Sequence, residues 1–307
     1  MLSTITLITL FQIATPGPTS ASVSTPSIGY SLAAAQLVHF TGIPGAAQAT
    51  FDPSGDWYTQ LKTASAGPYA ILVPAAPTSD ILYLTPNQVL TIPLAQPATN
   101  TAVSPSGSYF VALTTAQLLL YNRAGTLLAA MDYPAVGIPP TCVTDLLVSD
   151  LGEIILTSND TLWYSPKDAA SFTAIPMALT YARFKPHDHL LIAFDPGQGR
   201  LIAVHPTAAF AREPLLTPDD HLTPLTGLQF SADGSSVWFT QQTGPLEQYD
   251  FSTRTTTSFA VPDGILSTAL APGVFLWSQA NNSTTILDTT QTNPAVLIVP
   301  NSTGAFH

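Results

Sequence analysis

The feature that most constrains this fold is a strand–turn–strand unit that recurs along the chain. In its clearest copy, residues 103–123, the turn SPSG at 104–107 precedes two β-forming runs, 109–113 and 118–121. Proline presets φ and glycine permits positive φ, so the chain reverses there at low cost. Seven copies align on the turn residue, which is Gly29, Gly67, Gly107, Gly152, Asp188, Gly234 and Gly273.

The spacing of these copies is 36 to 46 residues, with a mean near 41. A period of about 40–45 residues is typical of a four-stranded propeller blade. Each copy has an apolar run before the turn and two β-forming runs after it, and weaker fourth runs lie at 126–132, 171–177, 255–261 and 295–299. No stretch longer than about ten residues has a helical period with caps. We therefore predict an all-β fold, a seven-bladed β-propeller of four-stranded antiparallel blades.

Closure of the ring depends on the two ends of the repeat. A propeller pairs or covers its first and last blades, because exposed sheet edges are sites of aggregation. The first copy begins directly at its turn, so its preceding strand is not evident. The run 295–299 is therefore expected either as the fourth strand of the seventh blade or as the strand that completes the first.

The charge pattern excludes two classes of partner. Charged residues make up only 9% of the chain, the formal net charge is −11, and the eight Lys and Arg residues are scattered. A nucleic-acid binder needs a clustered basic face to displace phosphate counterions, and no window supplies one. The same argument excludes peripheral binding to an anionic membrane. We expect no nucleic-acid partner, no transmembrane segment and a monomer.

The amino end resembles an export signal. Residues 5–14, ITLITLFQIA, have the length of a signal-peptide apolar region, and residues 19–21 offer a small-residue cleavage site. No Lys or Arg precedes the apolar run, although signal peptides usually carry one. We expect residues 1–21 to be a signal peptide or a disordered arm, residues 22–307 to form one propeller domain, and the protein to be periplasmic or extracellular.

A single cysteine, Cys142, excludes an internal disulfide. It precedes the apolar run 143–148, so we expect a small buried core residue, with a reactive thiol as the alternative. Trp163, Trp238 and Trp277 fall in predicted strands and are expected to pack between blades.

The turns SPSG at 104–107 and SADG at 231–234, each followed by a β run and a third strand, resemble the YVTN-type and lactonase-like β-propeller repeats of bacteria. The resemblance covers nearly the whole chain after residue 27. The fifth copy departs from it with Asp188 in place of glycine, and the Trp-Asp pair of WD40 repeats does not occur. This superfamily includes sugar lactonases, quinoprotein-like enzymes and binding platforms, so the resemblance implies architecture and not activity.

Two clusters are candidates for chemistry. His187 and His189 flank Asp188 and would share a face that suits a metal, whereas the alternative is a solvated turn in which Asp188 takes the glycine position. Residues 219–221 lie between a predicted fourth strand and the next first strand, a connection that opens on the face opposite the glycine turns. There a carboxylate pair with a histidine would hold Ca²⁺ or transfer a proton, the alternative being a solvated acidic loop. The candidate binding loop is Asp219, Asp220 and His221.

The motifs favour a binding protein over an enzyme. We expect an exported scaffold that presents loops to a protein or glycan partner, and we predict no catalytic residue, cofactor or metal. The alternative is a lactonase-like or other hydrolase with an acidic, metal-dependent site at the channel mouth. A structural subunit of an envelope assembly is a third hypothesis. Convergence of three or more Asp, Glu, His or Asn side chains at the mouth would favour the enzyme.

Overall fold

The computed structural model describes the chain in three parts. The amino-terminal part comprises strands 29–33, 36–41 and 48–51, and the carboxyl-terminal part comprises strands 265–271, 274–278, 284–288 and 298–299. Between them lies 58–259, apart from residues 68, 76–78, 86–87, 136, 140–141, 168–170, 217–221 and 242–244. Side chains are described only within 58–259.

Five four-stranded antiparallel sheets fill the central part, and each pairs its strands in chain order. The first two are β4 (Tyr58–Thr63), β5 (Ala70–Pro74), β6 (Ile81–Leu84) and β7 (Val89–Ile92), then β8 (Asn100–Val103), β9 (Tyr109–Leu113), β10 (Leu118–Asn122) and β11 (Leu127–Met131). The third is β12 (Asp145–Val148), β13 (Ile154–Thr157), β14 (Thr161–Ser165) and β15 (Thr173–Pro176). The last two are β16 (Thr180–Phe184), β17 (Leu191–Asp195), β18 (Arg200–His205) and β19 (Ala211–Pro214), then β20 (Leu225–Phe230), β21 (Ser236–Gln241), β22 (Leu246–Asp250) and β23 (Thr255–Phe259).

Two further sheets precede and follow these five along the chain. One has three strands, β1 (Gly29–Ala33), β2 (Gln36–Thr41) and β3 (Gln48–Phe51). The other has β24 (Ile265–Ala271), β25 (Val274–Ser278), β26 (Thr284–Asp288) and the two-residue β27 (Ile298–Val299). The prediction of an all-β propeller with four-stranded antiparallel blades is thus confirmed. The predicted number of seven such blades is wrong. Five blades are described in full, and the amino-terminal sheet has three strands because Gly29 lies within a strand instead of a turn.

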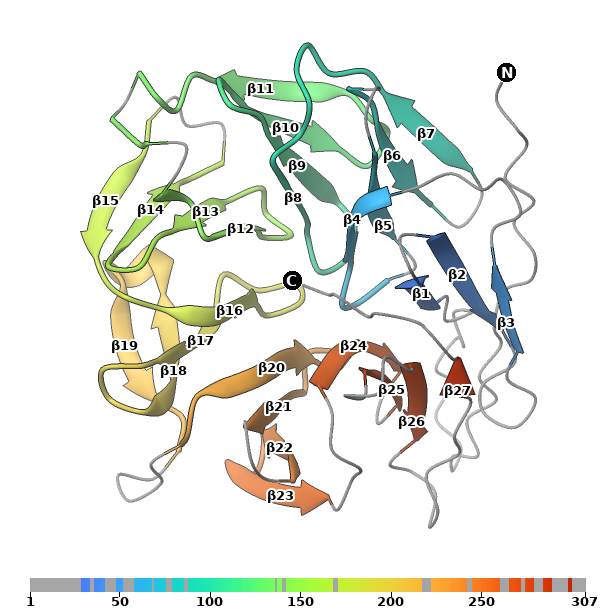
Figure 1. Cartoon of the computed structure of the whole chain (residues 1–307). Helices are drawn as coiled ribbons and strands as arrows, with labels where there is room; N and C mark the ends of the chain where they lie inside the picture. Colours follow the sequence, from blue (N-terminus) through green and yellow to red (C-terminus); the bar gives the residue numbers. More distant parts are fainter. Residues whose placement is uncertain are drawn as a thin grey trace.

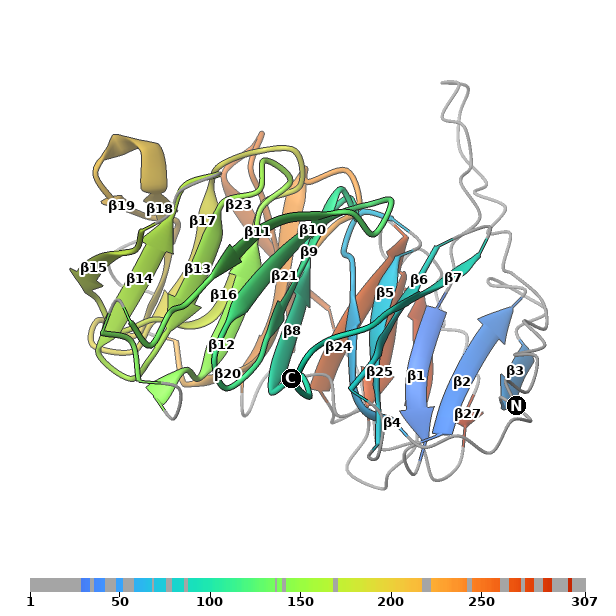
Figure 2. The ribbon, with the colours of Figure 1, turned by 90° about the horizontal axis from the view of Figure 1, so that it is seen from above.

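The sheets stand around a central axis (Figure 1), with β4, β8, β12, β16 and β20 innermost and β7, β11, β15, β19 and β23 at the periphery. Each of these innermost strands contacts the innermost strand of the next sheet. Figure 2, turned by 90° from Figure 1, looks across this axis and shows the strands running obliquely along it. The first strand of each blade therefore lines the axial channel.

The core consists of apolar layers between neighbouring blades. One layer joins the β8–β11 and β12–β15 blades through aliphatic side chains such as Val111, Leu120 and Leu156. Another joins the β4–β7 and β8–β11 blades, and there the rings of Tyr83, Phe110 and Tyr121 stack at centroid distances of 4.3 and 4.9 Å. Strands buried on both faces read as continuous apolar runs, which is why the second strand of each copy is the most hydrophobic.

Turns at the predicted positions connect the first and second strands of the five described blades. In the β8–β9 turn, Ser104 N donates to Tyr109 O and Gly107 N donates to Ser104 O. Gly107, Gly152 and Gly234 have φ of +68°, +83° and +69°, so the glycine pattern is confirmed at these three turns. Gly67 does not have a positive φ, so the predicted pattern is wrong for the turn between β4 and β5. Gly273 lies outside the described residues.

The β16–β17 turn departs from the predicted pattern. We expected Asp188 to adopt the left-handed conformation, but His187 does so, with φ of 59°. The Asp188 carboxylate instead accepts hydrogen bonds from the backbone N–H groups of His189 and Leu190, at 2.7 and 3.3 Å. This local Asx-type bonding fixes Asp188 and moves the left-handed residue one position earlier.

Several smaller predictions are resolved as well. The run 295–299 contributes β27, which pairs with β26, so it belongs to the last sheet and not to the first. Cys142 is exposed, so its predicted burial is wrong; it precedes β12 by three residues instead of entering the apolar strand. Trp163 packs against the layer between two blades, as predicted. The side chain of Trp277 lies outside the described set.

A short 3₁₀ turn, η2 (Pro206–Ala208), lies between β18 and β19. Within the part of the chain that the structure describes, no helix has the length and hydrophobicity needed to cross a bilayer.

Candidate ligand-binding channel

The axial channel contains two cavities that share part of their lining. A mouth cavity of about 520 Å³ is lined by the beginnings of β4, β8, β12 and β16 and by the residues just before them. An inner cavity of about 90 Å³ is lined by residues further along the same strands and by Gln229 of β20. Leu61, Lys62, Asp145 and Arg183 line both cavities, so they mark the passage from the mouth inwards. The mouth cavity has the size of an ordinary small-ligand pocket.

Threonines form the polar rim of this mouth. The residue eight positions before the aligned turn residue is threonine in all five described blades. Four of these threonines line the mouth cavity, namely Thr59, Thr99, Thr144 and Thr180, and the fifth is Thr226. The hydroxyl groups of Thr59, Thr99 and Thr144 donate to backbone carbonyls at the end of the neighbouring second strand, at 3.2, 3.1 and 3.0 Å. The carbonyls of Leu113 and Thr157 also accept the backbone N–H of Thr99 and Thr144, at 2.7 and 2.8 Å, so each of these threonines binds the neighbouring strand end twice. The hydroxyl groups make this rim polar and uncharged.

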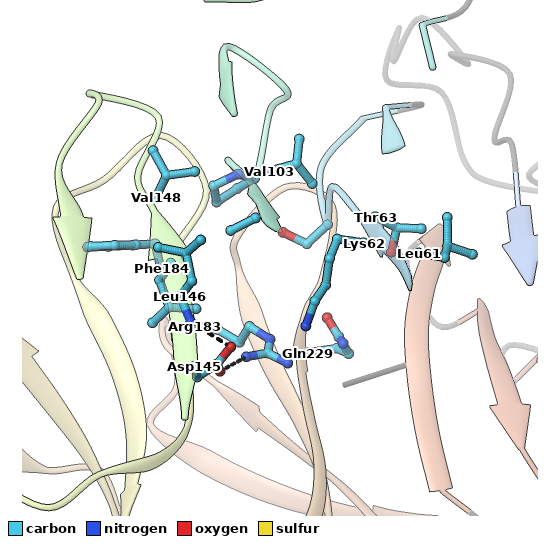
Figure 3. Close-up of a pocket in the computed structure, with 14 residues that line it drawn as sticks. Leu61, Lys62, Thr63, Val103, Asp145, Leu146, Val148, Arg183, Phe184 and Gln229 are labelled. Atoms are coloured by element: carbon cyan, nitrogen blue, oxygen red, sulfur yellow. Dashed lines mark hydrogen bonds and ion pairs between the residues drawn. The ribbon is translucent and has the colours of Figure 1, made fainter. Parts of the chain in front are cut away.

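Charged groups meet deeper in the channel. Lys62 and Arg183 each lie five positions before the aligned turn residue of their blade, and Asp145 lies seven positions before its own. These positions are on first strands, so the side chains of three separate blades meet at the axis. The Arg183 Nη1 group contacts Asp145 Oδ2 at 3.3 Å, with both side chains less than a third exposed. Figure 3 shows Lys62 extending from the opposite wall towards this ion pair. Among the described residues that line the two cavities, these three carry the only full charges.

The environment of Lys62 disfavours its charged form. Burial is the largest effect and lowers the pKa of the Lys62 ammonium below its ordinary value; Asp145 partly raises that pKa, and Arg183 lowers it further. No carboxylate of the described residues lies within ion-pair distance of this ammonium group. Among the described residues, the charge of Lys62 is therefore desolvated and only partly offset by Asp145.

Lys62→Met is expected to raise the free energy of unfolding at pH 7 by about 1 kcal/mol, because it removes a poorly solvated charge and keeps the aliphatic chain. The unfolded state binds the Lys62 proton more tightly than the folded state does. The free energy of unfolding of the wild type should therefore rise as the pH increases from the lowered folded pKa of Lys62 to its unfolded pKa of about 10.4. Over the same pH range, the difference in free energy of unfolding between the wild type and Lys62→Met should shrink. Urea denaturation across that pH range checks this. The control is Lys167→Met on the exposed surface, and a destabilised Lys62→Met protein would contradict the account.

Tyr181 stands at the mouth in a strained conformation. It has φ of 51°, and the pairing of β16 with β17 shifts register between Thr180 and Arg183. The residue is 39% exposed and lines the mouth cavity, although large aromatic side chains normally bury more of their surface. Strained non-glycine residues and bulges concentrate at binding sites, where they direct particular side chains. The bulge places an aromatic ring at the rim and Arg183 inside.

The two histidines considered as candidate metal ligands contact two different carboxylates. His187 Nδ1 lies 3.6 Å from Asp150 Oδ2, and His189 Nδ1 lies 2.9 Å from Glu153 Oε2. Glu153 also accepts a hydrogen bond from Tyr164 at 2.8 Å. These contacts join the turns of two adjacent blades. In the described ranges, no three His, Cys, Asp or Glu side chains gather closely enough to hold a metal ion.

The predicted loop of Asp219, Asp220 and His221 lies outside the described residues. No sequence motif indicated the channel residues Lys62, Arg183 and Tyr181. A usable signal was present, because polar residues at fixed positions before the turn interrupt otherwise apolar first strands. First strands line a propeller axis, so aligned interruptions such as Gln60, Asn100 and Asp145 point into one space.

Comparisons with known proteins agree with this architecture. No protein-family model and no curated protein matches the chain. Among solved structures, Hsv2 of Kluyvelomyces marxianus is similar with a TM-score of 0.54 and 9% identity, over 75% of this chain and 76% of Hsv2. YCF48 bound to D1 peptide is similar with a TM-score of 0.55 and 14% identity, over 82% of this chain and 84% of YCF48. Identities this low show the fold alone, so the resemblance to YVTN-type repeats remains a prediction.

Proposed function

We propose that this chain is a non-catalytic binding propeller whose channel mouth holds a peptide segment of a protein partner. The observation that carries the proposal is the mouth cavity of about 520 Å³, with the strained and exposed Tyr181 at its rim. An exposed aromatic ring beside a polar cavity is a common anchor for peptides, because it supplies contact area at low entropic cost.

Two further points support a peptide. The rim supplies backbone-sized polar groups, including the amide of Asn100, which suit the alternating donors and acceptors of a peptide backbone. The Gln60 amide group beside it donates to Thr99 O at 2.8 Å and keeps its remaining hydrogen-bonding capacity for a ligand. YCF48, a structural neighbour, is described as bound to D1 peptide, so a protein with a similar fold has a peptide ligand. We also propose export to the periplasm or cell exterior, on the basis of the apolar residues 5–14 alone.

The test begins with selection of peptides from a random display library on the immobilised full chain. Affinities of the selected peptides are then measured by fluorescence polarisation for wild type, Tyr181→Ala and Leu127→Ala. Leu127 is the matched control, because it is 49% exposed on the peripheral strand β11. We expect Tyr181→Ala to weaken binding by about tenfold or more, the usual effect of losing an aromatic anchor, and Leu127→Ala to leave it unchanged. Failure to enrich any peptide, or equal affinities for all three proteins, would contradict the proposal.

A further inference from the structure

The axial channel carries positive charge in a strongly acidic protein. The formal net charge of the chain is −11, and it contains only eight Lys and Arg residues. Two of these eight, Lys62 and Arg183, line the channel with a single carboxylate, Asp145. With Lys62 protonated, the described lining therefore carries one net positive charge.

The single carboxylate is already engaged. Asp145 Oδ1 accepts a hydrogen bond from Leu146 N at 2.9 Å, and Asp145 Oδ2 is paired with Arg183. Arg183 Nη1 also donates to Ala182 O at 2.7 Å, which holds the guanidinium against its own strand. The arginine is thus fixed in place, while Lys62 approaches from the facing wall (Figure 3) and has no carboxylate of the described ranges within ion-pair distance.

Such an arrangement favours an anion that enters from the mouth. A half-buried ammonium group costs free energy when it lacks a counter-charge, and an anion beside it removes that cost. The guanidinium of a fixed arginine is well shaped for a planar carboxylate. A carboxylate carries one negative charge and matches the single excess charge, whereas a dianionic phosphate would exceed it and lie close to Asp145.

We infer that the channel binds one carboxylate of the partner between the Lys62 ammonium and the Arg183 guanidinium, an inference that rests on the proposed function. The carboxylate belongs either to the carboxyl terminus of the peptide or to an Asp or Glu side chain within it. Both sources share the same chemistry at Lys62 and Arg183. Tyr181 and the rim amides then contact the rest of the peptide outside.

The lysine content of the chain allows a direct test. Only three lysines occur, Lys62, Lys167 and Lys185, so protein labelled with ¹³C at the lysine ε carbon gives three resolvable side-chain signals. Lys167 and Lys185 serve as internal controls, because Lys167 lies over the Tyr109 ring and Lys185 is paired with Asp188. The full chain is titrated at constant ionic strength.

Four probes distinguish the sources. They are acetyl-triglycine with a free carboxyl terminus, acetyl-Gly-Asp-Gly-amide with a side-chain carboxylate, acetyl-triglycine amide with neither, and inorganic phosphate. We expect a saturable shift of the Lys62 signal with one or both carboxylate probes, together with a raised Lys62 pKa. The other two lysine signals should stay in place, and the uncharged amide should have no effect.

Variants provide the second readout. For the carboxylate probe that binds, Lys62→Met should weaken affinity by about tenfold or more, as expected for losing a charge-assisted contact, and Lys167→Met should leave it unchanged. Tighter binding of phosphate, an equal response to the amide, or no Lys62 response would overturn the inference. If Lys62 does not respond but selected peptides still lose affinity with Tyr181→Ala, the carboxylate inference fails alone and the proposed function stands.

Discussion

Replacing Asp150 with alanine is expected to lower the free energy of unfolding by about 3–5 kcal/mol, the cost of losing a buried and fully bonded charge. The Asp150 side chain is only 5% exposed. Its Oδ1 atom accepts hydrogen bonds from the backbone N–H and the hydroxyl of Ser106, both at 2.7 Å, and its Oδ2 atom accepts one from His187 N at 2.9 Å. Because Ser106 and His187 belong to the two adjacent blades, this one carboxylate joins three consecutive turns.

The matched control is Asp132→Ala. The Asp132 carboxylate is exposed and accepts from Ala135 N at 3.1 Å, a contact within its own turn. Its loss should cost no more than about 1 kcal/mol, as is usual for a surface position. Urea denaturation monitored by circular dichroism measures both variants. Equal destabilisation of the two proteins would show that the contacts between blades at Asp150 contribute little.

Gly107→Ala is expected to lower the free energy of unfolding by about 3 kcal/mol or more, the sum of a left-handed backbone penalty and overpacking. Gly107 has φ of +68°, and an added Cβ would collide with the ring of Tyr69. A shift of that ring would disturb its contact with the Arg123 guanidinium, at 4.6 Å, and its stacking on Tyr83, at 6.1 Å. The carbonyl of Gly107 also accepts hydrogen bonds from Tyr83 at 2.7 Å and Arg123 at 3.2 Å, so the turn cannot shift without breaking them.

Gly137→Ala separates the two contributions. Gly137 has φ of +88°, but no atom lies within 4 Å of an added Cβ. This variant should lose only the conformational part, about 1 kcal/mol. Thermal and urea unfolding of both variants give the comparison. If Gly107→Ala is no less stable than Gly137→Ala, the packing of Tyr69 against the turn has been overestimated.

The fold was largely predictable because each blade repeats the same local chemistry. Turn glycines such as Gly107 and Gly234 need positive φ, and the runs beside them are strongly β-forming, so spacing alone indicated a propeller. The prediction failed where a glycine lies in a strand instead of a turn, and where a turn forms without a glycine. Gly29 lies in a strand, and the Asp188 turn reaches the same reversal through a different residue.

The candidate site was less predictable, because it depends on register and convergence. Lys62 and Arg183 lie 121 positions apart in the sequence, and only the closing of the sheets around an axis brings them together. The bulge in β16 also displaces Tyr181 from its expected register, and no local signal indicates a bulge there. A cluster that is contiguous in sequence, such as Asp219 to His221, can be recognised without knowing the strand register or the closure of the sheets.

Photo-crosslinking of a bound peptide tests most directly whether the ligand occupies the channel mouth. A selected peptide carrying a benzophenone group is irradiated with the full chain, and mass spectrometry identifies the modified residues. The account predicts crosslinks to Tyr181 and to neighbouring mouth residues such as Gln60 and Asn100, with yields that fall in the Tyr181→Ala protein. Crosslinks confined to residues 219–221, or to the peripheral strands β11, β15, β19 and β23, would contradict it.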